Sequence, residues 1–319
     1  MAWRDARRSV PASYPYWCGW GVVAAVFVVD IAWLDASGDA VRWDGALAVA
    51  QVIAICVGLG GALCGVARIP RYRDLAVQFR YHEVAETLFA LALLATFVSV
   101  TSVLSYLCVT LDPPLIDAAL LRTDARLGFD WPAAYAWGRA HASVRAGFAF
   151  AYDSAKWQLI GVTVLLGVTG RRAALREFVW LFMASCLLAV AISAPFPAAS
   201  AFVHFGVTDP NTADTVSDFA LLRHGGLRVF DLAALQGLVS MPSFHAVMGV
   251  LFAYALRRVP VLSVAALGLN ALMIVSTPTQ GGHYLIDVIA GLLLAAVVIG
   301  GSRWVRGETM WRGRRRLGG

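Results

Sequence analysis

Charged residues are scarce in this sequence. Only 14% of its 319 residues are Asp, Glu, Lys or Arg, whereas 59% are hydrophobic and the mean hydropathy is +0.69. Soluble domains carry about 25% charged and roughly 45–50% apolar residues. The shortage of charge excludes a soluble enzyme, a disordered chain and a fibrous repeat, and it predicts a polytopic membrane protein.

Lysine is almost absent as well. Lys156 is the only lysine, so 25 of the 26 basic residues are arginine, and the formal net charge is +6. A basic chain can bind nucleic acid, but these arginines lie between long apolar runs, where they are typical of membrane topology. We therefore expect membrane lipids as partners and no nucleic acid.

Patterns that bind metals are missing too. All five cysteines lie inside apolar runs, and no CxxC motif or Cys/His spacing typical of a metal site occurs. We interpret the cysteines as small hydrophobic residues, and we expect neither a metal nor a cofactor. They are Cys18, Cys56, Cys64, Cys108 and Cys186.

Long apolar runs, in contrast, are abundant. A membrane-spanning helix needs about 20 mostly apolar residues, and eight runs approach or reach that length. They lie at 17–34, 46–66, 84–109, 148–169, 177–197, 241–256, 261–277 and 284–303. The expected fold is therefore all-α, a polytopic membrane bundle of about eight helices.

Arginines divide unevenly between the two sides of such a bundle. With the N-terminus inside, 18 arginines fall in inner segments and 7 in outer segments. Because cytoplasmic loops carry an excess of positive charge, both chain ends are expected in the cytoplasm. The basic segment 1–16 resembles a signal peptide, but no convincing cleavage site follows it, so we interpret the first run as a retained span.

The loops and runs divide the chain into four parts. These are residues 1–110 with three spans, 111–147 as an outer interfacial loop, 148–303 as a membrane core, and 304–319 as a basic cytoplasmic tail. In the first outer loop, Leu115–Leu127 has the pattern of an amphipathic helix at the interface. A second outer loop covers about 198–240, and its aromatic and aliphatic residues argue against disorder.

His283 and Asp287 stand at the outer start of the last run. Four residues apart on a helix, they would share one face. A carboxylate beside an imidazole sets the tautomer of the ring and makes the other ring nitrogen a better nucleophile. An acid in the first turns of a spanning helix also needs a partner or a polar cavity, and His283 is the nearest candidate.

A second motif, Ser240-Met241-Pro242-Ser243-Phe244-His245, stands at the outer start of the sixth run. Pro242 suits the first helical position, which would leave Ser243 and the following amides free to bind a phosphate. His245 would lie one turn in, placed to exchange a proton with a group held there. Either motif alone is usually structural, but two on one side of the membrane, each at a helix start, favour catalysis.

Together the two motifs resemble the type 2 phosphatidic acid phosphatase (PAP2) superfamily. Pro242-Ser243-Phe244-His245 and His283-x-x-x-Asp287 are similar to its second and third motifs. The longer context, Met241–His245 and Ser276–Asp287, resembles its inositol phosphorylceramide synthase (aureobasidin-target) branch. Further residues similar to that branch are Asp124, Gly128, Asp130, Trp131, Phe196 and Pro197.

The resemblance implies a PAP2-like catalytic core over 148–303 and a metal-independent reaction. The histidine that matches His283 attacks phosphorus and forms a phosphohistidine, Asp287 orients it, and His245 protonates the leaving oxygen. The resemblance favours transfer of a phosphoinositol-like head group between lipids at the outer membrane face, as in sphingolipid metabolism. The alternative is hydrolysis of a lipid phosphate such as phosphatidate or a polyprenyl diphosphate.

The sequence departs from the superfamily in its cations. It has no Arg-Pro dipeptide from the usual Lys-x6-Arg-Pro motif, and Thr277 stands where an arginine usually precedes the nucleophile. Phosphoryl transfer needs cations or amides around its transition state. The candidate substitutes are Arg223 and Arg228 in the second outer loop and Lys156 in the fourth run. The alternative interpretations are solvated loop arginines and a buried Asp153–Lys156 pair.

Other functional classes agree less well with the motifs. A transporter would use Lys156, Asp153 and Asp30 as a substrate or proton path, and it predicts broken helices at mid-membrane and matched halves. The sequence shows neither. A non-catalytic scaffold predicts loss of the histidine pair, which is present.

Overall fold

The computed structural model describes residues 16–207 and 217–316, and it is 78% helical. The long helices are α1 (Tyr16–Ser37), α2 (Trp43–Ala67), α4 (Tyr81–Thr110), α7 (Ala142–Val168), α8 (Arg172–Ser193), α12 (Phe244–Leu256), α13 (Leu262–Gln280) and α14 (Leu285–Arg316). The short elements are η1 (Pro70–Tyr72), α3 (Arg73–Gln78), α5 (Asp117–Arg126), α6 (Trp131–Ala140), α9 (Ala201–His204), α11 (Ser217–Arg223), β1 (Ala40–Val41) and β2 (Val229–Phe230). The all-α membrane fold predicted from the sequence is confirmed.

Each predicted apolar run coincides with one long helix. Six of the described helices, α1, α2, α4, α8, α13 and α14, are long and apolar enough to cross a membrane. α12 is apolar but has 13 residues, and α7 has 27 residues that include Arg145, Asp153 and Lys156. The chain is therefore an integral membrane protein, while the count of eight spans stays a prediction.

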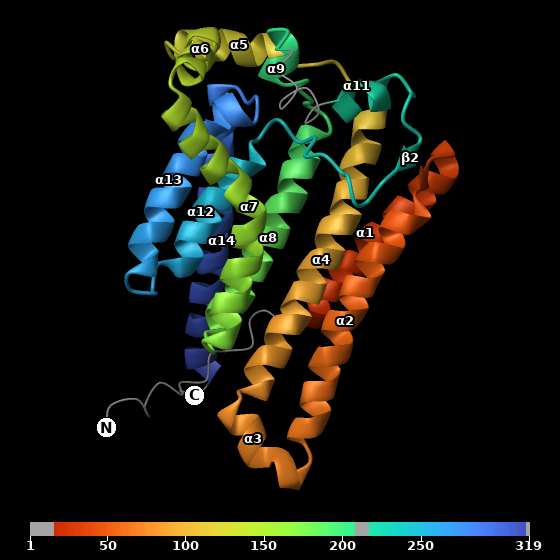
Figure 1. Ribbon diagram of the computed structural model, residues 1–319, viewed down its shortest axis with the longest axis vertical. Helices are drawn as coiled ribbons and strands as arrows, with labels where there is room; N and C mark the ends of the chain where they lie inside the picture. Colours follow the sequence, from red (N-terminus) through yellow and green to blue (C-terminus); the bar gives the residue numbers. More distant parts are fainter. Residues whose placement is uncertain (1–15, 208–216, 317–319) are drawn as a thin grey trace.

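The segments that connect the long helices gather at opposite ends of the bundle (Figure 1). At one end the predicted outer segments meet, where β1 pairs in parallel with β2 and Trp131 of α6 contacts the end of α13. At the other end the predicted inner segments meet, where Arg171 donates a hydrogen bond to the Arg258 carbonyl. The inner and outer segments thus alternate as predicted, and which end faces the cytoplasm stays a prediction.

Two parts of the predicted loops lie outside the described residues. They are residues 1–15, which hold the predicted basic N-terminal segment, and residues 208–216 of the second outer loop. At the other terminus, α14 continues without a break past residue 303 to Arg316, across the predicted boundary between core and tail.

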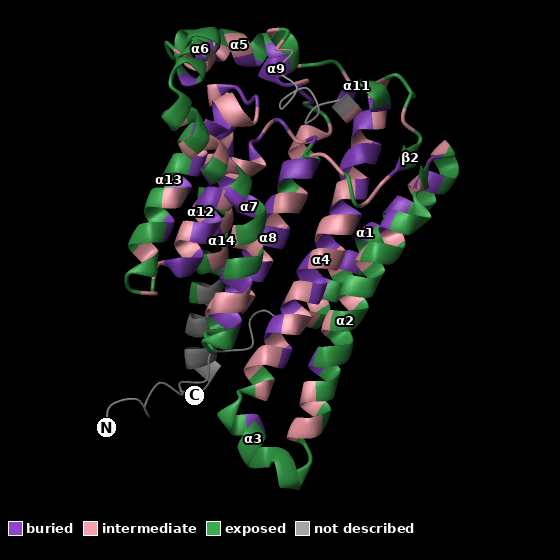
Figure 2. Ribbon diagram, in the orientation of Figure 1, coloured by how far each residue is buried: buried purple, intermediate pink, exposed green. Residues whose placement is uncertain are grey.

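The hydrophobic core lies among α4, α7, α8, α12 and α14. Phe97 of α4, Phe178 and Phe182 of α8, and Phe252 of α12 form a chain of ring contacts with centroids 6.0 to 6.4 Å apart. α1 and α2 pack against α4 at the edge of the bundle, and α2 is exposed over most of its length (Figure 2). Apolar side chains that face outward are expected where lipid replaces water around the helices.

Acids buried at the inner end connect the helices through arginines. Glu86 of α4 lies 2.8 Å from Arg176 of α8. Glu177 of α8, which is 6% exposed, accepts hydrogen bonds from the Tyr254 hydroxyl at 2.8 Å and from Arg257 at 3.1 Å. Part of the arginine excess at this end therefore neutralises buried acids.

Helix α5 lies across the outer end of the core (Figure 1) and carries two buried acids. The predicted amphipathic stretch Leu115–Leu127 forms this helix. Asp117, Leu120 and Asp124 are buried, whereas Leu127 is 53% exposed. Spacings of three and four residues place the buried set on one face, so two carboxylates point into the protein at the level of the predicted catalytic motifs.

Candidate active site

The start of α14 holds the predicted pair. His283 is 5% exposed and Asp287 is fully buried, and Nδ1 of His283 lies 3.6 Å from Oδ2 of Asp287. The same oxygen accepts hydrogen bonds from the backbone N–H of Tyr284 at 3.0 Å and from Oγ of Ser240 at 3.4 Å. Three polar groups thus surround Oδ2, whereas Oδ1 of Asp287 is buried without a hydrogen-bond partner among the described residues.

The helix begins later than the spacing predicts. α14 starts at Leu285, so His283 precedes it and the prediction that the pair shares one helical face is wrong. The two side chains still meet because Asp287 accepts the Tyr284 N–H, which turns the preceding residues back over the first helical turn. The contact therefore depends on a capping carboxylate as well as on helix periodicity.

α12 starts beside the same carboxylate. The Ser243 hydroxyl accepts the N–H of Ala246 at 3.4 Å, and the Ser243 N–H donates to the Asp287 carbonyl at 2.9 Å. The sequence predicts Pro242 at the first helical position, but Pro242 precedes the N-cap. The reason is that Ser243 has an extended backbone (φ −61°, ψ 113°) and supplies the capping oxygen. The two motifs are thus joined by a direct hydrogen bond, which the sequence analysis did not predict.

A glycine lets α12 and α14 approach this closely. A Cβ atom on Gly291 of α14 would collide with the Ser243 carbonyl oxygen and would lie 3.0 Å from Cβ of Ala246. Since a glycine has no Cβ, the backbone of α14 can lie against the first turn of α12. Gly291 therefore fixes the distance between the two helix starts.

His245 lies in the first turn of α12 and faces α7. Its ring stacks on Tyr152, with centroids 3.9 Å apart and planes 16° apart. A Cβ atom on Gly281 would lie 2.5 Å from the Tyr152 hydroxyl and 2.8 Å from Cδ2 of His283. Tyr152 therefore connects the two imidazoles: its ring stacks on His245, and its hydroxyl lies beside the glycine that His283 also borders. Nothing in the sequence distinguishes Tyr152 from other aromatic residues in apolar runs, so the fold alone identifies it.

Two carboxylates of α5 hold the start of α14. Asp124 is fully buried and accepts the backbone N–H groups of Leu285 at 2.7 Å and Ile286 at 2.9 Å. Asp117 accepts the Tyr284 hydroxyl at 3.0 Å. Burial raises the pKa of the Asp124 carboxyl above its ordinary value, and the two N–H donors oppose that rise.

The sequence contained a usable signal for these acids. Asp117 was missed, and Asp124 was named only with the resemblance. Seven residues apart with Leu120 between them, they lie on the apolar face of an amphipathic helix, where charge is unexpected. Trp131, also named with the resemblance, is 2% exposed and donates its indole N–H to the Pro278 carbonyl at 3.1 Å.

The arginines predicted to bind phosphate line a cavity that does not include the motif histidines. Arg223 of α11 pairs with Asp112, and Arg228 lies 3.1 Å from Asp39. Both line a cavity of about 260 Å³ at the outer ends of α1 and α4, whose lining includes neither histidine of the motifs. The structure does not bring these arginines to the histidines, and their binding of phosphate stays a prediction.

Lys156 lies on the outside of α7, one turn inward of Tyr152. Its side chain is exposed, with Nζ 5.8 Å from the centroid of the Trp157 ring. Asp153 is exposed as well, so the buried Asp153–Lys156 pair does not form. Thr277, at the position of the missing arginine, is fully buried and donates its hydroxyl to the Met273 carbonyl at 2.9 Å.

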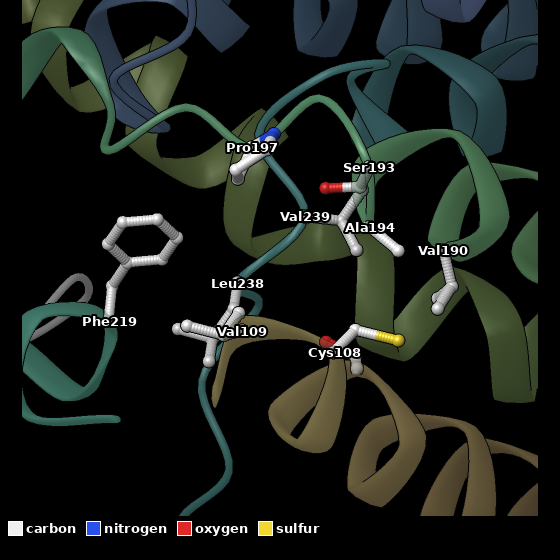
Figure 3. A pocket seen from close by; sticks show the side chains of 10 residues that line it. Cys108, Val109, Val190, Ser193, Ala194, Pro197, Phe219, Leu238 and Val239 are labelled. Carbon is white, nitrogen blue, oxygen red and sulfur yellow. The ribbon is translucent and has the colours of Figure 1, made fainter. Parts of the chain in front are cut away.

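A mostly apolar cavity lies near the motifs, between the outer ends of α4 and α8 (Figure 3). Val239 in its wall directly precedes Ser240, which contacts Asp287. Its lining consists of Ser105, Cys108, Val109, Val190, Ser193, Ala194, Pro197, Phe219, Leu238 and Val239. In the described part of the chain, no three His, Cys, Asp or Glu side chains are grouped as metal ligands.

A family model described as PAP2 superfamily matches residues 118–301, which is more than half of the chain. The matched region begins in α5 and ends in α14, so it includes both motifs and Asp124. It does not distinguish the inositol phosphorylceramide synthase branch from the rest of the superfamily. Searches among curated proteins and among solved structures found no match.

Proposed function

Because the chain belongs to the PAP2 superfamily, whose members are phosphatases and phosphotransferases acting on lipid phosphates, we propose that it transfers a phospho-head-group between lipids. The proposed head group is of the phosphoinositol type, and the proposed intermediate is a phosphohistidine on His283. One observation carries the proposal: Nδ1 of the buried His283 faces Asp287, and the Tyr152 ring that stacks on His245 lies beside the same glycine, Gly281, as His283.

The first step uses both histidines. Asp287 faces Nδ1 of His283, which leaves Nε2 as the nitrogen that attacks phosphorus. As the P–N bond forms, the bond from phosphorus to the leaving oxygen breaks, and protonated His245 gives its proton to that oxygen. Asp287 stabilises the positive charge that develops on the attacking ring.

The second step reverses these roles. Neutral His245 accepts the proton of the acceptor hydroxyl, whose oxygen attacks phosphorus while the bond to His283 breaks. Both enzyme groups return to their starting protonation states. We expect neither step to require a metal.

Backbone amides are the proposed partners of the phosphoryl oxygens. The first amides of a helix have no intrahelical acceptor, and a helix N-terminus attracts anions. At α12 the Ser243 hydroxyl takes the Ala246 N–H, which leaves the N–H groups of Phe244 and His245 in the first turn. These amides would replace part of the charge that an arginine at Thr277 would supply.

The burial of the site supports an acceptor other than water. His283 is 5% exposed, and Trp131, Phe202 and Tyr284 form an apolar cluster beside it. Excluding water protects a reactive intermediate from hydrolysis.

The test is product analysis with purified protein in phospholipid–detergent micelles that contain EDTA. Phosphatidylinositol is the donor and a long-chain diacylglycerol or ceramide is the acceptor. A new phospholipid and an acid-labile phosphoryl adduct on His283 are the expected results, and His283→Ala should abolish both. His141→Ala, at an exposed histidine of the same outer surface, is the matched control.

Each alternative has its own outcome. Free phosphate from phosphatidate, without a new lipid, would identify a phosphatase. Full turnover by His283→Ala would overturn the phosphohistidine, and loss of all turnover in EDTA would overturn the metal-independent reaction.

The proposal includes the side of the membrane on which the reaction occurs. The arginine distribution supports an active site on the extracytoplasmic face with both chain ends in the cytoplasm. A single cysteine at Arg228, in a variant without the five native cysteines, should react with a membrane-impermeant maleimide added to intact cells. Labelling only after lysis would reverse the orientation.

A further inference from the structure

The amides at the start of α14 are already occupied. The two oxygens of Asp124 accept the N–H groups of Leu285 and Ile286, the first two residues of the helix, at 2.7 and 2.9 Å. The Asp287 side chain takes the Tyr284 N–H just before them. A carboxylate is therefore bound where a helix N-terminus would otherwise attract a phosphate.

This carboxylate comes from a separate element that is fixed at several points. Asp117, two helical turns earlier on α5, accepts the Tyr284 hydroxyl, and Trp131 of α6 donates to the Pro278 carbonyl. These contacts fall on both sides of His283 in the chain. The α5–α6 segment thus contacts the residues that flank His283, whereas the side chain of His283 itself faces Asp287.

The starts of α12 and α14 differ in the charge of the group that caps them. At α14 both first-turn amides face a buried carboxylate, whose negative charge repels a phosphoryl group. At α12 the cap is an uncharged serine, and no acid among the described residues is recorded as bonding to the amides of Phe244 and His245. This difference would direct the substrate phosphate to the start of α12.

We infer that Asp124 is a positioning residue for the reaction assigned above to His283, and the inference rests on that proposed function. Asp124 locks the first turn of α14, which fixes the His283–Asp287 contact. It also closes that helix start to phosphate, so that the phosphoryl group binds only at α12. Asp124 does not touch the reacting atoms.

The first test measures how strongly Asp124 holds the first turn of α14, and it does not rely on enzyme activity. Hydrogen–deuterium exchange and mass spectrometry of the full-length protein in micelles should show slow exchange for a peptide covering residues 283–290. Asp124→Asn keeps the size of the side chain but replaces one acceptor oxygen with an NH₂ group, so exchange in this peptide should accelerate. Asp130→Asn is the matched control, because Asp130 is exposed and caps α6 through the Ala133 N–H.

The second test measures the consequence for turnover, with phosphatidylinositol as donor and ceramide as acceptor in micelles. Asp124→Asn should lower kcat by about tenfold to a hundredfold, since misplacing a reacting group by about 1 Å can cost that much. KM should change by less than about twofold, because the α12 amides remain. Orthovanadate should inhibit Asp124→Asn more strongly than the wild type, because the freed α14 amides offer a second anion contact.

A second variant changes the donor of the same hydrogen bond and serves as a control for misfolding of Asp124→Asn. Leu285→Pro deletes the N–H that Asp124 binds at the first helical position, where proline is tolerated. The double variant should lose little more kcat than Asp124→Asn alone, because both changes remove one contact. Additive losses would overturn the shared contact.

The outcomes separate this inference from the proposed function. Unchanged exchange in Asp124→Asn would overturn the lock, whether or not the wild type turns over lipid phosphate. Faster exchange with unchanged kcat, or an equal loss in Asp130→Asn, would overturn the positioning role. If the wild type transfers and hydrolyses no lipid phosphate, the proposed function fails, and the exchange experiment still decides whether Asp124 holds α14.

Discussion

Gly291→Ala is the substitution whose effect follows most directly from the structure. The new methyl group would collide with the Ser243 carbonyl oxygen and crowd Cβ of Ala246, both in rigid helix starts. Because these are backbone and Cβ atoms, no flexible side chain can move aside. The collision should push the first turn of α12 away from α14 and shift His245 with it.

Gly300 of the same helix provides the matched control, because a Cβ atom there would meet nothing within 4 Å. Alanine is favoured over glycine inside a helix by about 1 kcal/mol, so Gly300→Ala should stabilise the protein slightly. Gly291→Ala has the same gain but adds an overpacking cost of about 1–3 kcal/mol. The two variants should therefore differ in stability by about 1–3 kcal/mol, or roughly 2–6 °C in Tm at about 2 °C per kcal/mol.

Thermal unfolding in micelles, followed by tryptophan fluorescence, measures this difference, and head-group transfer from phosphatidylinositol to ceramide measures the shift of His245. Gly291→Ala should unfold at the lower temperature and lose most of its activity, while Gly300→Ala keeps both. Equal Tm values and equal turnover for the two variants would refute the close approach of α12 and α14 as the feature that sets the site.

Three further results are expected. Tyr152→Leu should lower kcat by about 2- to 10-fold and Tyr152→Phe much less, because an aromatic stack is worth about 0.5–1.5 kcal/mol and the phenylalanine retains it on His245; equal losses would assign the effect to the hydroxyl. The pKa of the Asp124 carboxyl is raised on folding, so between the two pKa values the native state binds a proton that the unfolded state does not. The Tm of the wild type relative to Asp124→Asn should therefore fall as pH rises from about 4 towards neutrality. A Tm difference independent of pH would contradict the raised pKa. Glu177→Ala should destabilise the protein by about 1–3 kcal/mol in urea or thermal unfolding, because it leaves Arg257 without its carboxylate, and an unchanged midpoint would contradict that role.

The helices could be predicted because lipid imposes a simple rule on the chain. Each span must satisfy its own backbone hydrogen bonds and present apolar side chains, so α2 and α4 are visible as continuous apolar runs. The site could be predicted in part because His245, His283 and Asp287 are polar residues at the ends of such runs, where their presence needs an explanation.

The remaining features depend on which helices become neighbours. Tyr152 acquires its role only when α7 packs beside α12, and apolar periodicity does not specify that neighbour. The expected starts of α12 and α14 were wrong by one or two residues because capping groups decided them: Ser243 capped its own helix, and Asp124 capped another from 161 residues away. Arg223 was expected at the phosphate because charge was missing there, but Asp112 lies closer to it.

The shortness of α12 has a consequence for how a substrate reaches the site. At about 1.5 Å per residue, its 13 residues span about 20 Å, whereas the hydrocarbon layer is about 30 Å thick. In the predicted topology, which puts Arg257 and Arg258 at the inner boundary, the other end of the helix would lie about 10 Å beneath the opposite boundary. A phosphate ester must therefore sink out of the head-group layer to meet His245. This depth favours substrates that a hydrocarbon chain already holds in the bilayer over phosphate esters dissolved in water.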